Sequence, residues 1–302
     1  MLQSIDLIHK EIMLSIHSSD DAIIACLLTE KYKGEKSFFE PYIKVLPKYV
    51  PNLSRFSDDE LIEIQDNLVE EQVRQQKKQK VDAYNTFLDI IPKLWKKYNI
   101  DINIKDVTFN DYLWAASIID SRGLRFQGQV HLAPFADMFN YKPHSSQREF
   151  DSGNFFLEHH RISEDTGSLT VLADQSQVSN KQLFEDYGDN SDQIYLQYHG
   201  FVPDINPFRC VNLKTPDADN IEEEYIRVFI GKVFGRRHLE YCVPSTGKLS
   251  ISLEVYIAIW LMNESEANKC TDIINKEYSK YNNREKFPVF EIITQKLSLI
   301  HI

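Results

Sequence analysis

The chain has 302 residues, of which 42% are hydrophobic and 26% charged, and its formal net charge is -11. This composition is typical of a globular protein, and the acidic excess disfavours duplex nucleic acid or an anionic membrane surface as the main partner. No apolar run approaches the roughly 20 residues of a membrane helix, and the N-terminus lacks a signal-peptide pattern. Four dispersed cysteines without a CxxC pair predict reduced thiols. The composition therefore predicts a soluble intracellular protein, cytoplasmic or nuclear.

Helical patterns fill the first 120 residues, beginning with a predicted helix over 18–33. Ser18 or Ser19 can cap its start, and Gly34 can end it. The next stretch, 37–51, is rich in aromatic residues and proline, which predicts packed irregular chain.

Two capping boxes predict the starts of further helices. In each, a hydroxyl accepts from the third helical amide while an acidic side chain reaches back, and the pairs are Ser57 with Glu60 and Thr108 with Asp111. The first helix is predicted to bury a row of apolar residues: Leu61, Ile64, Leu68 and Val73. A polar stretch at 72–80 is predicted to separate it from the next helix.

The sequence pattern changes from helical to β-like near Val130. Short β-like segments lie between polar turns at 155–159, 168–172 and 182–184. Helical patterns resume near Ile221 and continue to the end, and the apolar stretch 253–262 predicts buried core. The fold class predicted from these patterns is mixed α+β: a helical region, a small β-rich core and a helical tail.

Several kinds of site find no support. The sequence lacks the GxSxG, P-loop and GxGxxG motifs of serine hydrolases, nucleotide triphosphatases and dinucleotide-binding folds. His159 and His160 would point to opposite faces of a strand, and with His131 and His199 we interpret them as histidines without a metal. The acidic cluster at 58–71 is interpreted as the solvated face of a helix, with contact to a basic partner as the alternative.

Three motifs in the β region occur in a specific order. They are Ser-Arg at 121–122, LAPFADMFNY at 132–141, and QLFEDYGDNS at 182–191, which is followed by YHGF at 198–201. This order resembles that of the SET-domain methyltransferases.

A fourth motif narrows the resemblance. GEKSFFEPY at 34–42, followed by Leu46-Pro47, is similar to the helical insert of the Rubisco large-subunit lysine methyltransferase branch, whose relatives include the actin-histidine methyltransferase. The chain shows no post-SET cysteine cluster, which agrees with this branch rather than with zinc-stabilised histone-specific enzymes. The resemblance covers roughly residues 15–205.

The resemblance implies an α+β fold with a SET-type β core, a helical insert and a C-terminal all-helical region. The expected parts are a SET remnant with the helical insert at 1–119, the SET β core at 120–205, and a helical substrate-binding-like region at 206–302. It implies methyl transfer from S-adenosyl-L-methionine to a lysine of a non-histone protein. Histidine as the acceptor stays open, and no direct nucleic-acid or membrane partner is expected.

The resemblance also implies roles for individual residues. Tyr187 would be the catalytic tyrosine. The implied cofactor-binding residues are Arg122, Asp137, Met138, Phe139, Asn140, Tyr141, His199, Gly200 and Phe201. Arg122 would bind the cofactor carboxylate or the substrate backbone, and Phe201 would stack on the adenine; a helix-end charge and a core side chain are the alternatives. Such residues suit an in-line displacement, because it needs positioned reactants, excluded water and a neutral amine.

The chain departs from the family pattern in two places. Asn140-Tyr141 stands where the family has Asn-His, so the histidine side chain is lost. No Gly-x-Gly occurs in the chain, and only about 20 residues precede the insert, so part of the cofactor pocket is expected to be missing. The alternatives are a truncated sequence and a degenerate, inactive SET-like module that binds a protein partner. Unpaired sheet edges would favour truncation.

Overall fold

The computed structural model describes residues 7–126, 128–142, 160–163, 168–171, 178–188, 190–234, 239–244, 246–247 and 249–278. The chain divides into two compact units, Met1–Phe208 and Arg209–Ile302. The finer division at residues 119 and 205 stays a prediction. No described helix has both the length and the apolar content needed to cross a membrane.

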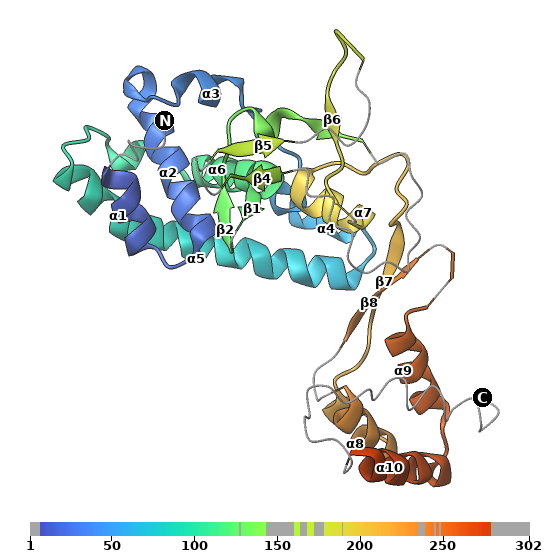
Figure 1. Cartoon of the computed structure of the whole chain (residues 1–302). Helices are drawn as coiled ribbons and strands as arrows, with labels where there is room; N and C mark the ends of the chain where they lie inside the picture. The colour runs from blue at the N-terminus through green and yellow to red at the C-terminus, as the bar shows by residue number, and fades with distance from the viewer. Residues whose placement is uncertain are drawn as a thin grey trace. The chain divides into compact units, whose positions relative to one another are not determined.

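Helices dominate the first unit. They are α1 (Leu7–Ser15), α2 (Ser19–Lys33), α3 (Glu40–Val45), α4 (Asp58–Ile62), α5 (Asn67–Lys97), α6 (Phe109–Arg122) and α7 (Asp192–Ile194), with 3-10 turns η1 (Gly34–Lys36), η2 (Leu53–Arg55), η3 (Ile104–Asp106) and η4 (Ala136–Met138) and the π-helical turn η5 (Tyr195–His199). The long α5 lies along α1, α2 and α6 (Figure 1). These four helices enclose one apolar core, whose largest fully buried side chains include Trp95, Tyr112 and Phe87.

The predicted helix ends in the first half of the chain are confirmed. Ser18 accepts from the amide of Asp21 at the start of α2, and Gly34 follows its last residue. Both capping boxes are present, at the starts of α4 and α6. Local hydrogen bonds of this kind are readable from sequence because both partners lie within one helical turn.

The predicted break at 72–80 is wrong. The helix that follows Ser57 already ends at Ile62, and Asp66 caps a new helix by accepting from two amides. That helix, α5, then runs unbroken through 72–80, because Val73 and Lys80 are buried while the exposed residues Arg74, Gln75, Lys78 and Gln79 lie on its solvent face.

The sheets of the first unit are short. β1 (Leu124–Phe126) pairs antiparallel with β2 (Gln129–His131), β4 (His160–Ile162) pairs antiparallel with β5 (Leu169–Val171), and β3 (Asn140–Tyr141) pairs parallel with β6 (Phe184–Glu185). The predicted segments 168–172 and 182–184 overlap β5 and β6, whereas 155–159 lies outside the described residues. The parallel pair sets Tyr141 beside Glu185, so it aligns the second and third motifs.

The second unit combines helices with a two-stranded ribbon. Its elements are β7 (Cys210–Lys214), η6 (Ala218–Asn220), α8 (Glu224–Val233), β8 (Glu240–Pro244), α9 (Ile251–Leu261) and α10 (Glu264–Tyr278). Phe229, Tyr256 and Ile259 lie in its core, which confirms that 253–262 contributes buried residues. The mixed α+β class is confirmed, but an entirely helical C-terminal region is not.

The ribbon corrects two expectations. β7 and β8 pair antiparallel, and the alternation of Val211 and Leu213 with polar neighbours has the period of a strand rather than of a helix. Cys210 and Cys242 form a disulfide with their Cα atoms 5.4 Å apart. The expectation of four reduced thiols is therefore wrong for this pair, because the hairpin brings together cysteines 32 residues apart in the sequence.

A buried carboxylate ties α2 to its surroundings. His9 Nε2 and Lys33 Nζ donate to Glu30 Oε1 over 2.7 and 2.6 Å, and Ser37 Oγ donates to Oε2 over 2.6 Å. Burial would raise the pKa of Glu30, but these hydrogen bonds together outweigh it and lower the pKa from 4.5 to about 2. Since the folded state holds the carboxylate ionised, this stability is present above pH 4.5 and is lost as the pH falls toward 2.

We expect Glu30→Gln to lower the free energy of unfolding at pH 7 by about 2–3 kcal/mol. The variant should also lose less stability than the wild type between pH 4.5 and 3. Urea unfolding at three pH values measures both effects. Glu60→Gln, in the exposed capping box of α4, is the control. If the free energy of unfolding of Glu30→Gln fell as steeply with decreasing pH as that of the wild type, Glu30 would not be the group responsible for the acid dependence.

Candidate active site

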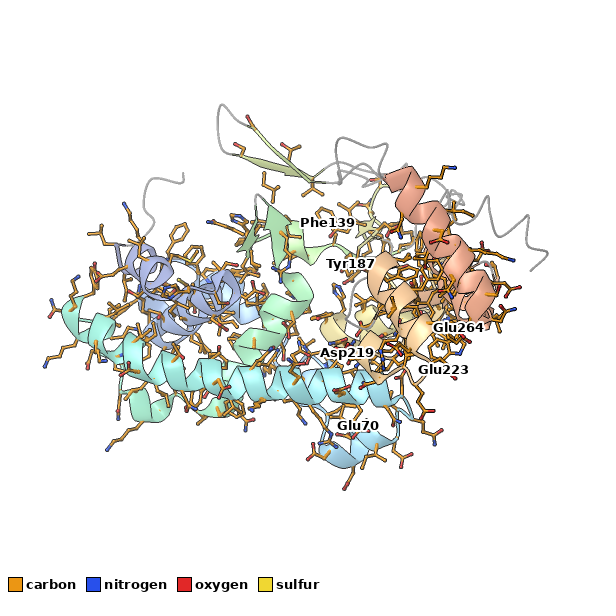
Figure 2. The ribbon with its side chains drawn as sticks, turned by 90° about the horizontal axis from the view of Figure 1, so that it is seen from below. Glu70, Phe139, Tyr187, Asp219, Glu223 and Glu264 are labelled. Atoms are coloured by element: carbon orange, nitrogen blue, oxygen red, sulfur yellow. A yellow bond between two sulfur atoms is a disulfide. The ribbon has the colours of Figure 1, made fainter. Side chains whose placement is uncertain are left out.

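Tyr187 lies at the point where the second and third motifs meet. It follows β6 by two residues, and its Oη donates to the backbone carbonyl of Phe139 over 2.6 Å, next to β3 (Figure 2). The chain turns directly afterwards, because the amide of Gly188 donates to Asp186 Oδ1 over 2.9 Å and Gly188 has a φ of 101° that favours glycine. The pairing of β3 with β6 and this turn together fix the phenol.

The Tyr187 hydroxyl is a neutral donor at ordinary pH. Burial raises its pKa to about 12, with a further contribution from Glu185, and the positive charge of Arg122 opposes the shift. The hydroxyl therefore keeps its proton and can orient a neighbouring group by hydrogen bonding.

Arg122 reaches the same region from the end of α6. Its Nη1 donates to the carbonyl of Asp137 over 2.6 Å and lies 3.6 Å from Asp137 Oδ2. The side chain of Asp137 has no exposed surface, whereas that of Arg122 is 26% exposed. The guanidinium is thus held on one side and can still pair with an anion on the other.

The Asp137 carboxylate is buried with one oxygen satisfied. Tyr42, on α3, donates to Oδ2, and Oδ1 has no hydrogen-bond partner within the described part of the chain. Burial raises the pKa of Asp137, although the bond from Tyr42 and the charge of Arg122 act in the opposite direction.

An aromatic cluster surrounds Tyr187. Its ring lies 5.1 Å from that of His199 and 5.5 Å from that of Tyr141, measured between ring centroids. Tyr195 and Phe201 complete the cluster, with Tyr195 at 4.8 Å from Tyr141 and 5.4 Å from Phe201. Ring faces attract cations and exclude water, so this cluster suits a sulfonium, a cation that cannot lose its charge by deprotonation.

His199 and Gly200 connect the cluster to the helical region. His199 Nδ1 lies 3.2 Å from the carbonyl of Ser121; since a carbonyl only accepts, Nδ1 carries the proton. Burial lowers the pKa of His199, which favours the neutral ring. Gly200 has a φ of 79°, and a Cβ there would lie 2.9 Å from the carbonyl carbon of Pro51. A glycine is therefore required by the close approach of two backbones.

The structure brings most of the predicted site residues together. Phe139, Tyr141, His199 and Phe201 contact Tyr187, while Arg122 and Asp137 contact each other and lie close enough for their charges to act on Tyr187. Met138 and Asn140 lie in the same segment with exposed side chains. Among the described residues, no group of three or more His, Cys, Asp or Glu side chains could hold a metal ion. His159 and the side chain of His160 lie outside the described atoms.

Two residues of the site were not predicted from sequence. Tyr195 is fully buried, and its Oη donates to the carbonyl of Gly188 over 2.9 Å, which braces the turn after Tyr187. Tyr42 stands in the quoted insert motif, but its partner Asp137 is 95 residues away, so no local spacing reveals the contact.

No family model matches the chain. It is 23% identical over 284 residues to SET domain-containing protein 4 of Artemia parthenogenetica, an alignment that covers 89% of this chain and 66% of that protein. It is 24% identical over 271 residues to Protein SET DOMAIN GROUP 40 of Arabidopsis thaliana, covering 83% and 52%. A solved structure of the SET domain of Rubisco LSMT with methyl-lysine and AdoHcy superposes with a TM-score of 0.61 at 14% identity, over 93% of this chain and 74% of that one. The chain is therefore related in sequence to SET-domain proteins and shares the SET fold.

The predicted relationship to the Rubisco lysine methyltransferase branch is thereby confirmed. A further relative of the chain is the ribosomal lysine N-methyltransferase set10 of Schizosaccharomyces pombe, 23% identical over 71% of this chain and 38% of that protein. The chain spans about half to two thirds of the length of the first two curated relatives.

Proposed function

We propose that this chain is an S-adenosyl-L-methionine-dependent protein-lysine N-methyltransferase with a non-histone acceptor. The observation that carries the proposal is the 2.6 Å bond from Tyr187 Oη to the Phe139 carbonyl, which holds a neutral phenol among aromatic rings and near Arg122. This bond joins two motifs that are far apart in the sequence, in a fold shared with structures titled as bound to AdoMet or AdoHcy.

The residues present fit the charged ends of S-adenosylmethionine. The half-buried guanidinium of Arg122, braced by Asp137, suits its carboxylate. Oδ1 of Asp137, which has no hydrogen-bond partner among the described residues, is a buried acceptor on the same side. The aromatic faces of Tyr141 and Tyr187 suit a sulfonium. When bound, the cofactor supplies the electrophilic methyl group.

The chain's own residues would position the acceptor. The Tyr187 hydroxyl, fixed by the Phe139 carbonyl, orients the amine, while Tyr195 keeps the adjacent turn in place. The aromatic cluster excludes water and lowers the pKa of an entering lysine, because the charged form loses its hydration there. The contribution of the protein is thus orientation and desolvation.

Calorimetric titration with S-adenosylhomocysteine tests the proposal. We expect micromolar binding, about -8 kcal/mol. Arg122→Ala should weaken it by about tenfold to a hundredfold, the size of a charge-assisted pair. Arg125→Ala, which removes an exposed pair with Asp20, is the matched control and should bind like the wild type. A wild-type chain that does not bind would overturn the enzymatic proposal and favour an inactive protein-binding module.

Lysine as the acceptor is supported by what the relatives are named for: ribosomal lysine methylation in set10, and methyl-lysine in the LSMT structure. Ribosomes from a Schizosaccharomyces pombe strain lacking set10 would be incubated with the chain and labelled S-adenosylmethionine. After acid hydrolysis, labelled methyl-lysine is the expected product, and labelled methyl-histidine would replace lysine by histidine in the proposal.

A further inference from the structure

Tyr42 contacts the site from outside the motifs that form it. It lies on α3, and its Oη donates to Asp137 Oδ2, 95 residues further along the chain. The Asp137 side chain is fully buried, and burial raises the pKa of Tyr42 above its usual range, so the phenol keeps its proton. This is therefore a buried, charge-assisted hydrogen bond, the stronger kind in proteins.

The hydrogen bond from Tyr42 limits how the Asp137 carboxylate can rotate. Within the described chain, Tyr42 is the hydrogen-bond donor to its carboxylate, because Arg122 Nη1 is 3.6 Å from Oδ2 and bonds the Asp137 carbonyl instead. Without the phenol, the buried carboxylate would lose its short hydrogen bond and keep the looser 3.6 Å ion pair with Arg122, which is costly. The nearest remedy is rotation of the carboxylate and the guanidinium toward each other. The orientation of Arg122 thus depends on Tyr42.

We propose that Tyr42 is a positioning residue: it fixes the Asp137 carboxylate and thereby keeps the Arg122 guanidinium directed toward an anionic group of the bound ligand. The inference rests on the proposed function and names its anion, the carboxylate of the amino-acid end of S-adenosylmethionine. α3 then contributes to cofactor affinity through Asp137 and Arg122.

Two probes separate this role from a merely structural one. S-adenosylhomocysteine carries the carboxylate, and methylthioadenosine has the same nucleoside and sulfur without it. We expect Tyr42→Phe to raise the Kd for S-adenosylhomocysteine about tenfold and to leave the Kd for methylthioadenosine unchanged. In an Arg122→Ala background, Tyr42→Phe should add almost nothing, because its effect passes through Arg122.

Tyr98→Phe is the matched control. Tyr98 Oη also donates to a carboxylate, that of Glu11 on α1, so this variant loses the same type of bond away from the site. It should lose less stability than Tyr42→Phe by thermal melting, because the Glu11 carboxylate is 27% exposed and keeps its pair with Lys97, and it should bind both probes like the wild type. Equal weakening of both probes in Tyr42→Phe, or no weakening, would overturn the inference while the proposed function stands. Absence of S-adenosylhomocysteine binding in the wild type would overturn both.

Discussion

Replacing Tyr187 with phenylalanine is expected to slow methyl transfer by about a hundredfold to a thousandfold and to leave the Kd for S-adenosylhomocysteine within about twofold. The variant keeps the ring in its cluster and removes only the hydroxyl that bonds the Phe139 carbonyl. Single-turnover transfer of labelled methyl to the ribosomal fraction, with calorimetry alongside, measures both quantities. Because the pKa of Tyr187 is about 12, the wild-type rate should show no titration of this group between pH 6 and 10.

The control for this substitution is Tyr84→Phe. Tyr84 Oη likewise donates to a backbone carbonyl, that of Val107, over 2.8 Å, in the helical region. It should lose a similar hydrogen bond without a change in rate. If Tyr187→Phe kept full activity, the hydroxyl would have no part in the mechanism. If the variant lost cofactor binding, the hydroxyl would be a structural group.

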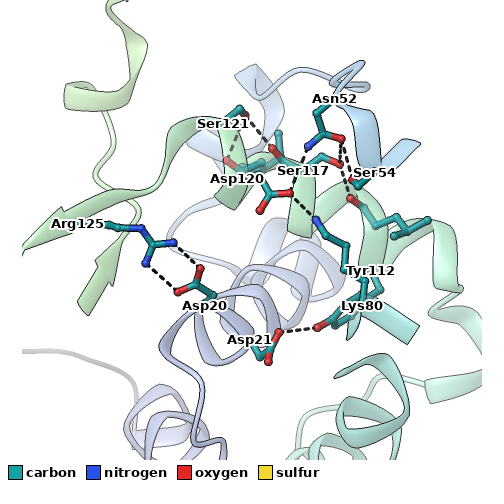
Figure 3. A network of polar contacts seen from close by, with 12 residues as sticks. Asp20, Asp21, Asn52, Ser54, Lys80, Tyr112, Ser117, Asp120, Ser121 and Arg125 are labelled. Carbon is teal, nitrogen blue, oxygen red and sulfur yellow. Dashed lines mark hydrogen bonds and ion pairs between the residues drawn. The ribbon is translucent and has the colours of Figure 1, made fainter. Parts of the chain in front are cut away.

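Lys80→Met is expected to cause the largest loss of stability, about 3–5 kcal/mol. Lys80 of α5 pairs with Asp120 of α6, their side chains are only 10% and 16% exposed, and Asn52 also donates to Asp120 (Figure 3). Removal of the ammonium leaves a buried carboxylate without its counter-charge. Burial already raises the pKa of Asp120 against the pull of Lys80, so the variant should lose less stability at pH 5 than at pH 8. Urea unfolding at both pH values measures this.

Two companion variants make the result specific. Lys80→Met/Asp120→Asn should recover part of the loss, since the uncompensated charge is gone. Lys93→Met removes the exposed pair with Asp89, 70% and 74% exposed, and should change stability by less than about 1 kcal/mol. A double variant no more stable than Lys80→Met would show that packing of the lysine stem, rather than charge, is what the core loses.

The sequence predicted the features whose causes are local. The N-cap at Ser18, the end at Gly34 and both capping boxes involve partners within a turn, and each is confirmed. The predicted break at 72–80 failed because polar residues on the outer face of a long helix look like a linker when only one face is buried.

The sequence predicted those site residues that lie in the quoted motifs, but not the contacts that other residues make with them. The order of the motifs indicated which segments meet, and the structure places Tyr187 and Arg122 near one another. Tyr42 was missed because its contact with Asp137 is set by how α3 packs, which no spacing encodes. The Cys210–Cys242 disulfide was missed for the same reason, since it follows from the register of β7 and β8.

The parallel pairing of β3 with β6 has a consequence for the order of folding. Its partners Asn140 and Phe184 are 44 residues apart, so closing that loop costs about 3 kcal/mol of chain entropy plus a constant before the short ladder returns any stability. The caps of α2 and α6, by contrast, close within a few residues. The individual helices should therefore form early, and the Tyr187 site should form only after the loop between β3 and β6 has closed.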